Sequence, residues 1–163
     1  MGSPNRIGRA VATQTPAPGG VTLFYDADCG VCSWLALRAV RAAPPCTVRA
    51  LPIDSTEAEP QMGKLGDEAR WASWHILGED GRLRSGGAAA PVLLEQLPHT
   101  RPLVRLLRAT PRATERLYRL GAATRSLWGR LVPRRSVARA RRELAVLTTH
   151  SQSKRGAQCR TIL

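Results

Sequence analysis

Two cysteines, Cys29 and Cys32, are separated by two residues and follow closely on a short apolar run, Val21–Tyr25. The run predicts a strand and the residues after Cys29 predict a helix, so the pair is expected at a strand-to-helix junction. A cysteine there lies near unpaired backbone N–H groups and the positive end of the helix dipole, which stabilise a thiolate. The second thiol, one turn along, can attack a mixed disulfide. The spacing is therefore typical of dithiol redox chemistry, with Cys29 as the attacking thiolate and Cys32 as the resolving thiol.

Two carboxylates, Asp26 and Asp28, flank this pair. Nearby carboxylates raise the pKa of a thiol and therefore oppose the helix dipole. We hypothesise that one of the two accepts or relays the proton of the second thiol as the disulfide opens or closes. The alternative for Asp28 is purely structural, because it directly precedes the helix, where Asp is a favoured N-cap. Asp26 lies at the end of a buried strand and is therefore harder to explain as a solvated surface residue without a role.

Other interpretations of the two cysteines are half of a structural zinc site, or a pair of inert buried thiols. Zinc usually takes four ligands, commonly from a second C-x-x-C or a pair of histidines. The other candidate ligands are scattered along the chain, so the sequence disfavours zinc. They are the isolated residues His75, His99, His150 and Cys46. We expect His75 on a hairpin face rather than in the role of a base, and Cys46 and Cys159 as bystanders.

The charge of the chain divides it into two regions. The 163 residues carry a net charge of +13. Residues 1–100 hold 9 Lys or Arg against 10 Asp or Glu, a balance of −1, whereas residues 101–163 hold 16 against 2, a balance of +14. The two regions therefore differ in the solvent and the partners that they favour.

The N-terminal elements predict a βαβ unit. Val21–Tyr25 is expected to be a strand buried on both faces, and a helix is expected from Cys29 to Arg41. Pro44 and Pro45 end that helix, and Thr47–Ile53 alternates as a second strand. Strand, helix and strand over about 33 residues imply parallel strands joined by a right-handed crossover.

The next elements complete the order βαβαββα, which is that of a thioredoxin-like α/β domain. A weak helix is expected in part of residues 56–71. Two short extended runs, Trp74–Leu77 and Arg82–Ser85, flank an Asp-Gly turn and predict a β-hairpin. A helix is expected over Ala88–Leu97, with Pro91 in its first turn.

The basic C-terminal region predicts three further helices. One is short and holds Leu103 and Leu107, and a third is weaker and covers Ser136–Leu147. Between them, Thr110–Pro111 is expected to begin an amphipathic helix with arginines opposite its apolar stripe, formed by Leu117, Leu120, Thr124, Leu127 and Leu131. The expected organisation is a disordered leader over 1–20, a thioredoxin-like redox domain over 21–97, a basic helical extension over 98–147 and a disordered tail over 148–163.

The segment Tyr25–Cys32 closely resembles the D-x-D-C-x-x-C signature of the DCC family of thiol–disulfide oxidoreductases. Weaker resemblances extend over about residues 21–131. They lie at Leu51–Pro52, at Gly78–Arg82, at Ser85–Ala88, and at Leu117–Leu120 followed by Arg125.

This resemblance implies a thioredoxin-like fold, with Cys29 and Cys32 as the redox pair and Asp26 as the signature aspartate. The chain departs from thioredoxins in two places. Val31 stands where thioredoxins have the proline of C-G-P-C, so their redox potential does not transfer. No proline directly precedes Trp74–His75, where thioredoxins place a cis-proline that faces the active site, so recognition of a substrate backbone is expected to differ.

We therefore expect a cytoplasmic, monomeric thiol–disulfide oxidoreductase that exchanges the Cys29–Cys32 dithiol with a protein or small-molecule disulfide. No metal or organic cofactor is required for that chemistry. No apolar run approaches the roughly 18 residues of a membrane span, and residues 1–20 lack the apolar core of a secretory signal. The alternative is a binding module that uses the arginine-rich C-terminal region on nucleic acid or on an anionic membrane. A solvated basic face on docked helices is the simpler interpretation of that region.

Overall fold

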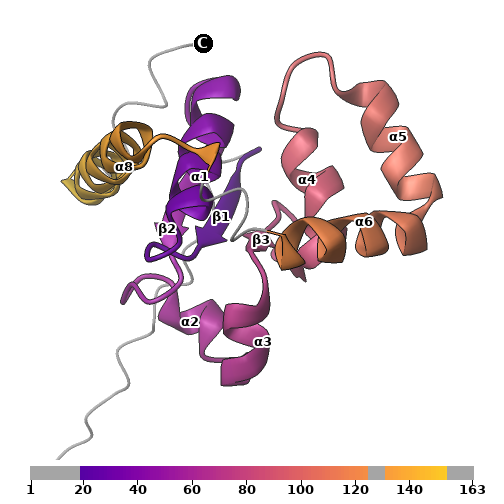
Figure 1. The fold of residues 1–163 in the computed structure, drawn as a ribbon, viewed down its shortest axis with the longest axis horizontal. Coiled ribbons are helices and arrows are strands. Elements are labelled where there is room, and N and C mark those ends of the chain that lie inside the picture. The colour runs from indigo at the N-terminus through magenta and orange to yellow at the C-terminus, as the bar shows by residue number, and fades with distance from the viewer. Residues whose placement is uncertain (1–18, 125–130, 154–163) are drawn as a thin grey trace, which may run out of the picture.

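The computed structural model describes residues 19–124 and 131–153 (Figure 1). The strands are β1 (Val21–Tyr25), β2 (Val48–Pro52), β3 (His75–Leu77) and β4 (Leu83–Ser85). The helices are α1 (Gly30–Ala42), α2 (Glu59–Met62), α3 (Asp67–Ala72), the 3-10 helix η1 (Gly86–Ala89), α4 (Ala90–Leu94), α5 (Arg101–Ala109), α6 (Pro111–Ala123) and α8 (Arg134–Ser153).

The four strands form one mixed sheet in the order β2-β1-β3-β4. β1 pairs in parallel with β2, in a register that runs from Val21 opposite Val48 to Tyr25 opposite Pro52. β3 is antiparallel to both β1 and β4. The parallel pair confirms the predicted βαβ unit, and the antiparallel pair confirms the predicted hairpin. This mixed α/β sheet and its order of elements are consistent with the predicted thioredoxin-like fold.

β1 is buried on both faces, because alternate side chains enter different cores. Leu23 (1% exposed) belongs to a cluster that includes residues of α1, α4 and α8. Phe24 (2% exposed) points to the other face, where it packs with Leu77 and with Met62 of α2. The end of β1 is thereby held from both sides, which fixes the point at which the chain leaves the sheet.

Some element boundaries differ from the predictions. The predicted weak helix over 56–71 is two short helices, α2 and α3, because Gly63 and Gly66 interrupt it. The predicted helix over Ala88–Leu97 begins earlier, as η1 at Gly86, and its α-helical part ends at Leu94. α8 continues past Leu147 to Ser153, so the predicted end at Leu147 is too early. Residues 1–18 of the predicted leader and residues 154–163 of the predicted tail, with Cys159, lie outside the described residues, as do Arg125 and Leu127.

The C-terminal helices pack on the domain through only part of their surfaces. α6 lies against η1, where Gly87 donates its N–H to the Glu115 carboxylate at 2.9 Å. A Cβ on Gly87 would stand 2.7 Å from the Glu115 Cα, so glycine permits this close approach. The predicted leucine stripe of α6 faces solvent, since Leu117 and Leu120 are 67% and 63% exposed. α8 lies beside α1 (Figure 1) and buries Ala140 and Leu144.

No helix in the part of the chain that the structure describes is both long enough and apolar enough to span a bilayer.

His75 lies in the hairpin strand β3, as expected, but it is fully buried. Its Nε2 lies 2.9 Å from the Arg70 carbonyl oxygen and its Nδ1 lies 2.7 Å from the Ser85 hydroxyl. A carbonyl only accepts, so Nε2–H donates to Arg70, and in the neutral ring Nδ1 then accepts from the Ser85 hydroxyl. Burial lowers the pKa of His75 below the ordinary value of 6.5, so the ring is neutral at neutral pH. This histidine ties α3 to the hairpin and is no free base.

The buried His75 makes stability depend on pH. Below pH 6.5 the unfolded chain binds a proton that the folded chain does not, so the free energy of unfolding falls as pH falls towards the lowered pKa. We expect the wild-type chain to lose more stability than His75→Gln between about pH 7.5 and about pH 5, measured by urea denaturation. Glutamine retains a donor for Arg70 but does not titrate. Parallel pH profiles for the two chains would contradict this prediction.

Candidate functional site

The junction between β1 and α1 brings Cys29 and Cys32 together. β1 ends at Tyr25, three residues turn the chain, and Cys29 becomes the N-cap of α1. The two cysteines form a disulfide, with their Cα atoms 5.2 Å apart. Both are half-buried, so the bond is within reach of solvent. The structure thus shows the oxidised state of the pair that the sequence singled out.

The sulfur of Cys29 occupies the capping position of the helix. Cys29 has extended backbone geometry, and its Sγ accepts the backbone N–H of Cys32 at 3.3 Å. The first turn of a helix has N–H groups without partners and carries the positive end of the dipole. The same arrangement stabilises negative charge on Cys29 when the disulfide is open, as expected of an attacking thiolate.

The loop before Cys29 is held by Asp26. Its Oδ1 accepts the backbone N–H groups of Asp28 at 2.9 Å and of Cys29 at 3.1 Å. Asp28 is exposed and is not the N-cap, because Cys29 takes that position. The N-cap role considered for Asp28 is therefore wrong, and Asp26 caps the loop instead, because its short side chain reaches the next N–H groups.

Ser33 also shapes this loop, and sequence analysis missed it. The side chain is fully buried, and its hydroxyl donates to the Ala27 carbonyl at 3.2 Å. Its backbone N–H donates to the Cys29 carbonyl at 3.0 Å. The sequence did offer a signal for Ser33, because it is a small polar residue directly after the C-x-x-C and on the inward face of the helix.

The C-terminal helix α8 reaches the site from the other end of the chain. Val137 lies over Gly30, where a Cβ would stand 2.9 Å from Cγ1 of Val137. Arg141 donates from Nη2 to the Asp28 carbonyl at 2.7 Å. No local pattern marks either contact, because Arg141 is one of many arginines and is 113 residues from Asp28 in sequence.

Trp74 stands directly before β3. All peptide bonds that the structure describes are trans. The Trp74 ring stacks on Tyr118 of α6, with centroids 6.1 Å apart, and its backbone N–H donates to the Tyr118 hydroxyl at 3.2 Å. Its indole N–H donates to the Gly86 carbonyl at 3.0 Å. Trp74 packs against the same core cluster as Ala27 and Trp34 of the cysteine loop and helix.

Tyr25 is buried at the end of β1, beside the cysteine loop. Burial, and then the negative charge of Asp54, raise the pKa of Tyr25 to about 12, while the positive charge of Arg141 partly offsets them. The phenol is therefore protonated at neutral pH and does not serve there as a base.

The described residues contain no cluster of three or more His, Cys, Asp or Glu side chains that could hold a metal ion. His75 is engaged by Arg70 and Ser85. Cys46 lies in the turn before β2, at the opposite end of the parallel pair from the cysteine loop, and is itself in a disulfide. Cys46 is therefore not a free thiol in this structure.

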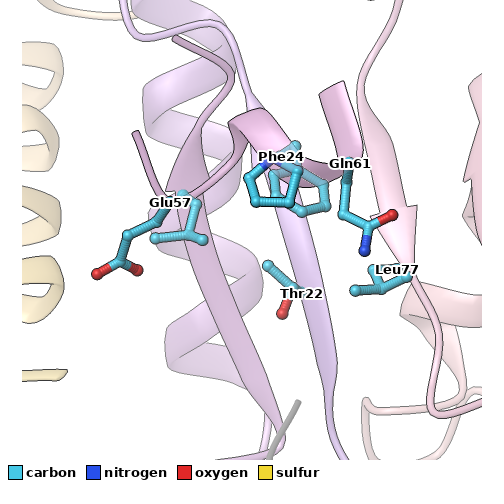
Figure 2. Close-up of a pocket in the computed structure, with 7 residues that line it drawn as sticks. Thr22, Phe24, Glu57, Gln61 and Leu77 are labelled. Carbon is cyan, nitrogen blue, oxygen red and sulfur yellow. The ribbon is translucent and has the colours of Figure 1, made fainter. Parts of the chain in front are cut away.

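One small hollow lies on the face of the sheet opposite α1. It is lined by Thr22, Phe24, Leu51, Glu57, Pro60, Gln61 and Leu77 (Figure 2). Its volume is about 10 Å³, roughly the space that a single water needs. This hollow is therefore too small for an organic substrate.

Comparison with known proteins adds one match. The model of the family described as DCC1-like thiol-disulfide oxidoreductase matches residues 23–131. The matched segment contains both cysteines, Asp26 and the helices up to α6, and it ends before α8. No curated protein and no solved structure matches the chain.

Proposed function

The chain belongs to the DCC1-like thiol-disulfide oxidoreductase family, and from this premise we propose that Cys29 and Cys32 exchange electrons with a disulfide-containing protein or small molecule. One observation carries the proposal. Cys29 caps α1 with its sulfur, and the Cys32 sulfur is close enough to be bonded to it. A pair placed in this way is close enough to form and break a disulfide across the first turn of α1.

In the reducing direction, the Cys29 thiolate attacks one sulfur of the substrate disulfide. A Cys29–substrate mixed disulfide forms, and the other substrate sulfur leaves as a thiolate that takes up a proton. Cys32 then loses its proton and attacks the Cys29 sulfur, which closes the Cys29–Cys32 disulfide and releases the second substrate thiol. The substrate gains two electrons and the protein loses two. The oxidising direction is the reverse.

The reaction needs only the two sulfurs and a proton carrier, so the proposal includes no metal and no organic cofactor. It places the protein in the cytoplasm as a monomer, where the thiol pool can reduce the Cys29–Cys32 disulfide again. The assignment of Cys29 as the attacking thiol is supported by its capping position, because the Cys32 N–H and the helix dipole both act on its sulfur.

The first prediction concerns the order of attack. After reduction, Cys32→Ser should accumulate a mixed disulfide with oxidised glutathione on Cys29, because nothing resolves it. Cys29→Ser should form its adduct at least about tenfold more slowly, because Cys32 lacks the capping position. Intact mass measured over time in graded glutathione buffers follows both adducts. Cys46→Ser is the control and should leave the closure of the Cys29–Cys32 pair unchanged. Equal trapping rates in the two site variants would contradict the assignment.

We also propose that Asp26, rather than Asp28, takes the proton of Cys32 as the disulfide closes. Asp26 is half-buried and touches the Cys29 backbone, whereas Asp28 is exposed. The Oδ1 of Asp26 is occupied by two N–H groups, and its second oxygen is the atom proposed to accept the proton.

Asparagine separates this proton role from capping. Asp26→Asn retains an oxygen for the two N–H groups but loses the charge, so closure at neutral pH should slow by at least about tenfold while stability changes little. Asp26→Ala should also lose about 1 kcal/mol of stability. Closure is timed by rapid acid quench and alkylation at several pH values. Asp28→Asn makes the same charge change and should close at the wild-type rate. Wild-type closure in Asp26→Asn would refute the proton role.

A second proposal concerns the exposed face of α5 and α6, which we propose binds anionic lipid headgroups. The two helices carry six arginines and one carboxylate, Glu115. They also expose three leucines to solvent by more than half: Leu106, Leu117 and Leu120. Strong amphipathicity, low mean hydropathy and arginines beside exposed leucines are typical of helices that lie in a membrane interface. This feature favours a lipid surface over nucleic acid, which would use the arginines but not the leucines.

Binding to vesicles tests this surface. The full chain should sediment with vesicles of phosphatidylserine and phosphatidylcholine, and less with phosphatidylcholine alone. Replacing both Leu117 and Leu120 by serine should weaken binding by at least about tenfold, because two apolar side chains no longer enter the interface. Both leucines are exposed, so folding should be unaffected. Undiminished binding of the double variant, or equal binding to duplex DNA of matched charge, would rule out lipid insertion.

A further inference from the structure

α8 is part of the folded domain although it lies beyond the segment that the family model matches. Its Ala140 and Leu144 are 0% and 1% exposed and belong to the core cluster that also holds residues of α1. On the rim of this contact, Glu143 forms ion pairs with Arg41 of α1 and with Arg139 of its own helix. The position of α8 on α1 is therefore set by apolar packing and by charge together.

This packing brings Arg141 to the cysteine loop. Ala140 faces the core, Val137 lies over Gly30 one turn earlier, and Arg141 donates to the Asp28 carbonyl at 2.7 Å. The peptide that carries this carbonyl also carries the N–H of Cys29, which Asp26 accepts. The Asp28–Cys29 peptide is thus held at its oxygen by α8 and at its nitrogen by the loop.

The guanidinium is close enough to Cys29 to act on its charge. Five covalent bonds separate the Asp28 carbonyl oxygen from the Cys29 sulfur, so the guanidinium lies within about 9 Å of that sulfur. This is about one Debye length at physiological ionic strength, and arginine is protonated at every relevant pH. The electrostatic reach of Arg141 into this region is also visible at the neighbouring Tyr25, whose pKa it lowers against the effects of burial and Asp54.

We propose that Arg141 is a positioning residue of the redox site, which orients the Asp28–Cys29 peptide and stabilises the Cys29 thiolate. The proposal rests on the proposed function for the role of that thiolate. The charged groups around Cys29 fall into two sets. Asp26 and Asp28 on the loop oppose the thiolate, whereas the N-terminus of α1 and Arg141 favour it. Arg141 is the member of the second set that comes from outside the strand-to-helix junction.

Alkylation of Cys29 measures the thiolate without any exchange partner. In a Cys32→Ser background, the rate of iodoacetamide reaction at Cys29 is followed by mass across a pH series. Arg141→Gln should move the midpoint upward by roughly half a unit to one unit, and should slow the reaction by roughly threefold to tenfold below the midpoint. Arg141→Lys retains the charge and should restore most of the midpoint. In about 1 M salt the difference from wild type should shrink, because the Debye length falls to about 3 Å.

Arg142→Gln is the matched control. Arg142 is the next residue on the helix, is exposed, and forms no ion pair with a described residue. The control makes the same change in net charge and should leave the midpoint unmoved. An unchanged midpoint in Arg141→Gln, or an equal shift in Arg142→Gln, would overturn the proposal. If circular dichroism shows that Arg141→Gln unfolds α8, the alkylation midpoints of Arg141→Lys and of wild type are compared at low and at high salt, and this comparison still tests the proposal.

The outcomes separate this inference from the proposed function. A shifted midpoint in Arg141→Gln, together with a wild-type Cys29–Cys32 pair that does not exchange with glutathione, would support Arg141 and reject the oxidoreductase proposal. Normal exchange with glutathione, together with an unmoved midpoint in Arg141→Gln, would support the oxidoreductase proposal and reject the role of Arg141.

Discussion

The structure depends on how the free N–H groups at the start of α1 are satisfied. A helix begins with N–H groups that have no partner in the helix. Here the Asp26 carboxylate accepts two N–H groups of the loop, and the Cys29 sulfur accepts that of Cys32. The atom that caps the helix is therefore also the atom proposed to react. A site built in this way begins to lower the cost of a thiolate through the fold itself, because the backbone already places an N–H group against the Cys29 sulfur.

The rest of the fold holds this junction in place. β1 is fixed between two strands and two core clusters, so its last residue, Tyr25, has one position. Ser33 and Arg141 then bind the carbonyls of the loop from α1 and α8. The groups that hold the loop thus come from three parts of the chain, one of them more than a hundred residues away. Packing at long range therefore acts together with the local motif to set the environment of the cysteines.

The sequence predicts those parts of the fold that are encoded locally. An apolar run, a double proline and an Asp-Gly turn were enough for β1, the end of α1 and the β3–β4 hairpin. The N-cap was considered only for Asp28, which is the wrong residue, because propensity favours Asp and takes no account of a thiol as an acceptor. Arg141 was not foreseen, since the contact depends on which face of α8 packs on α1. The stripe of α6 was recognised but not its exposure, because periodicity identifies an apolar face without showing what covers it.

The opposed charges around Cys29 have a chemical consequence. A thiol that is never ionised does not attack, but the nucleophilicity of a thiolate falls as its pKa falls, so the best attacking thiol has a pKa near the ambient pH. The N-terminus of α1 and Arg141 favour ionisation, while Asp26 and Asp28 oppose it. The pKa of Cys29 is therefore set by the balance between these two sets of charges. Because Arg141 belongs to a helix outside the segment that the family model matches, this balance can be tuned in this chain without changing the cysteine motif itself.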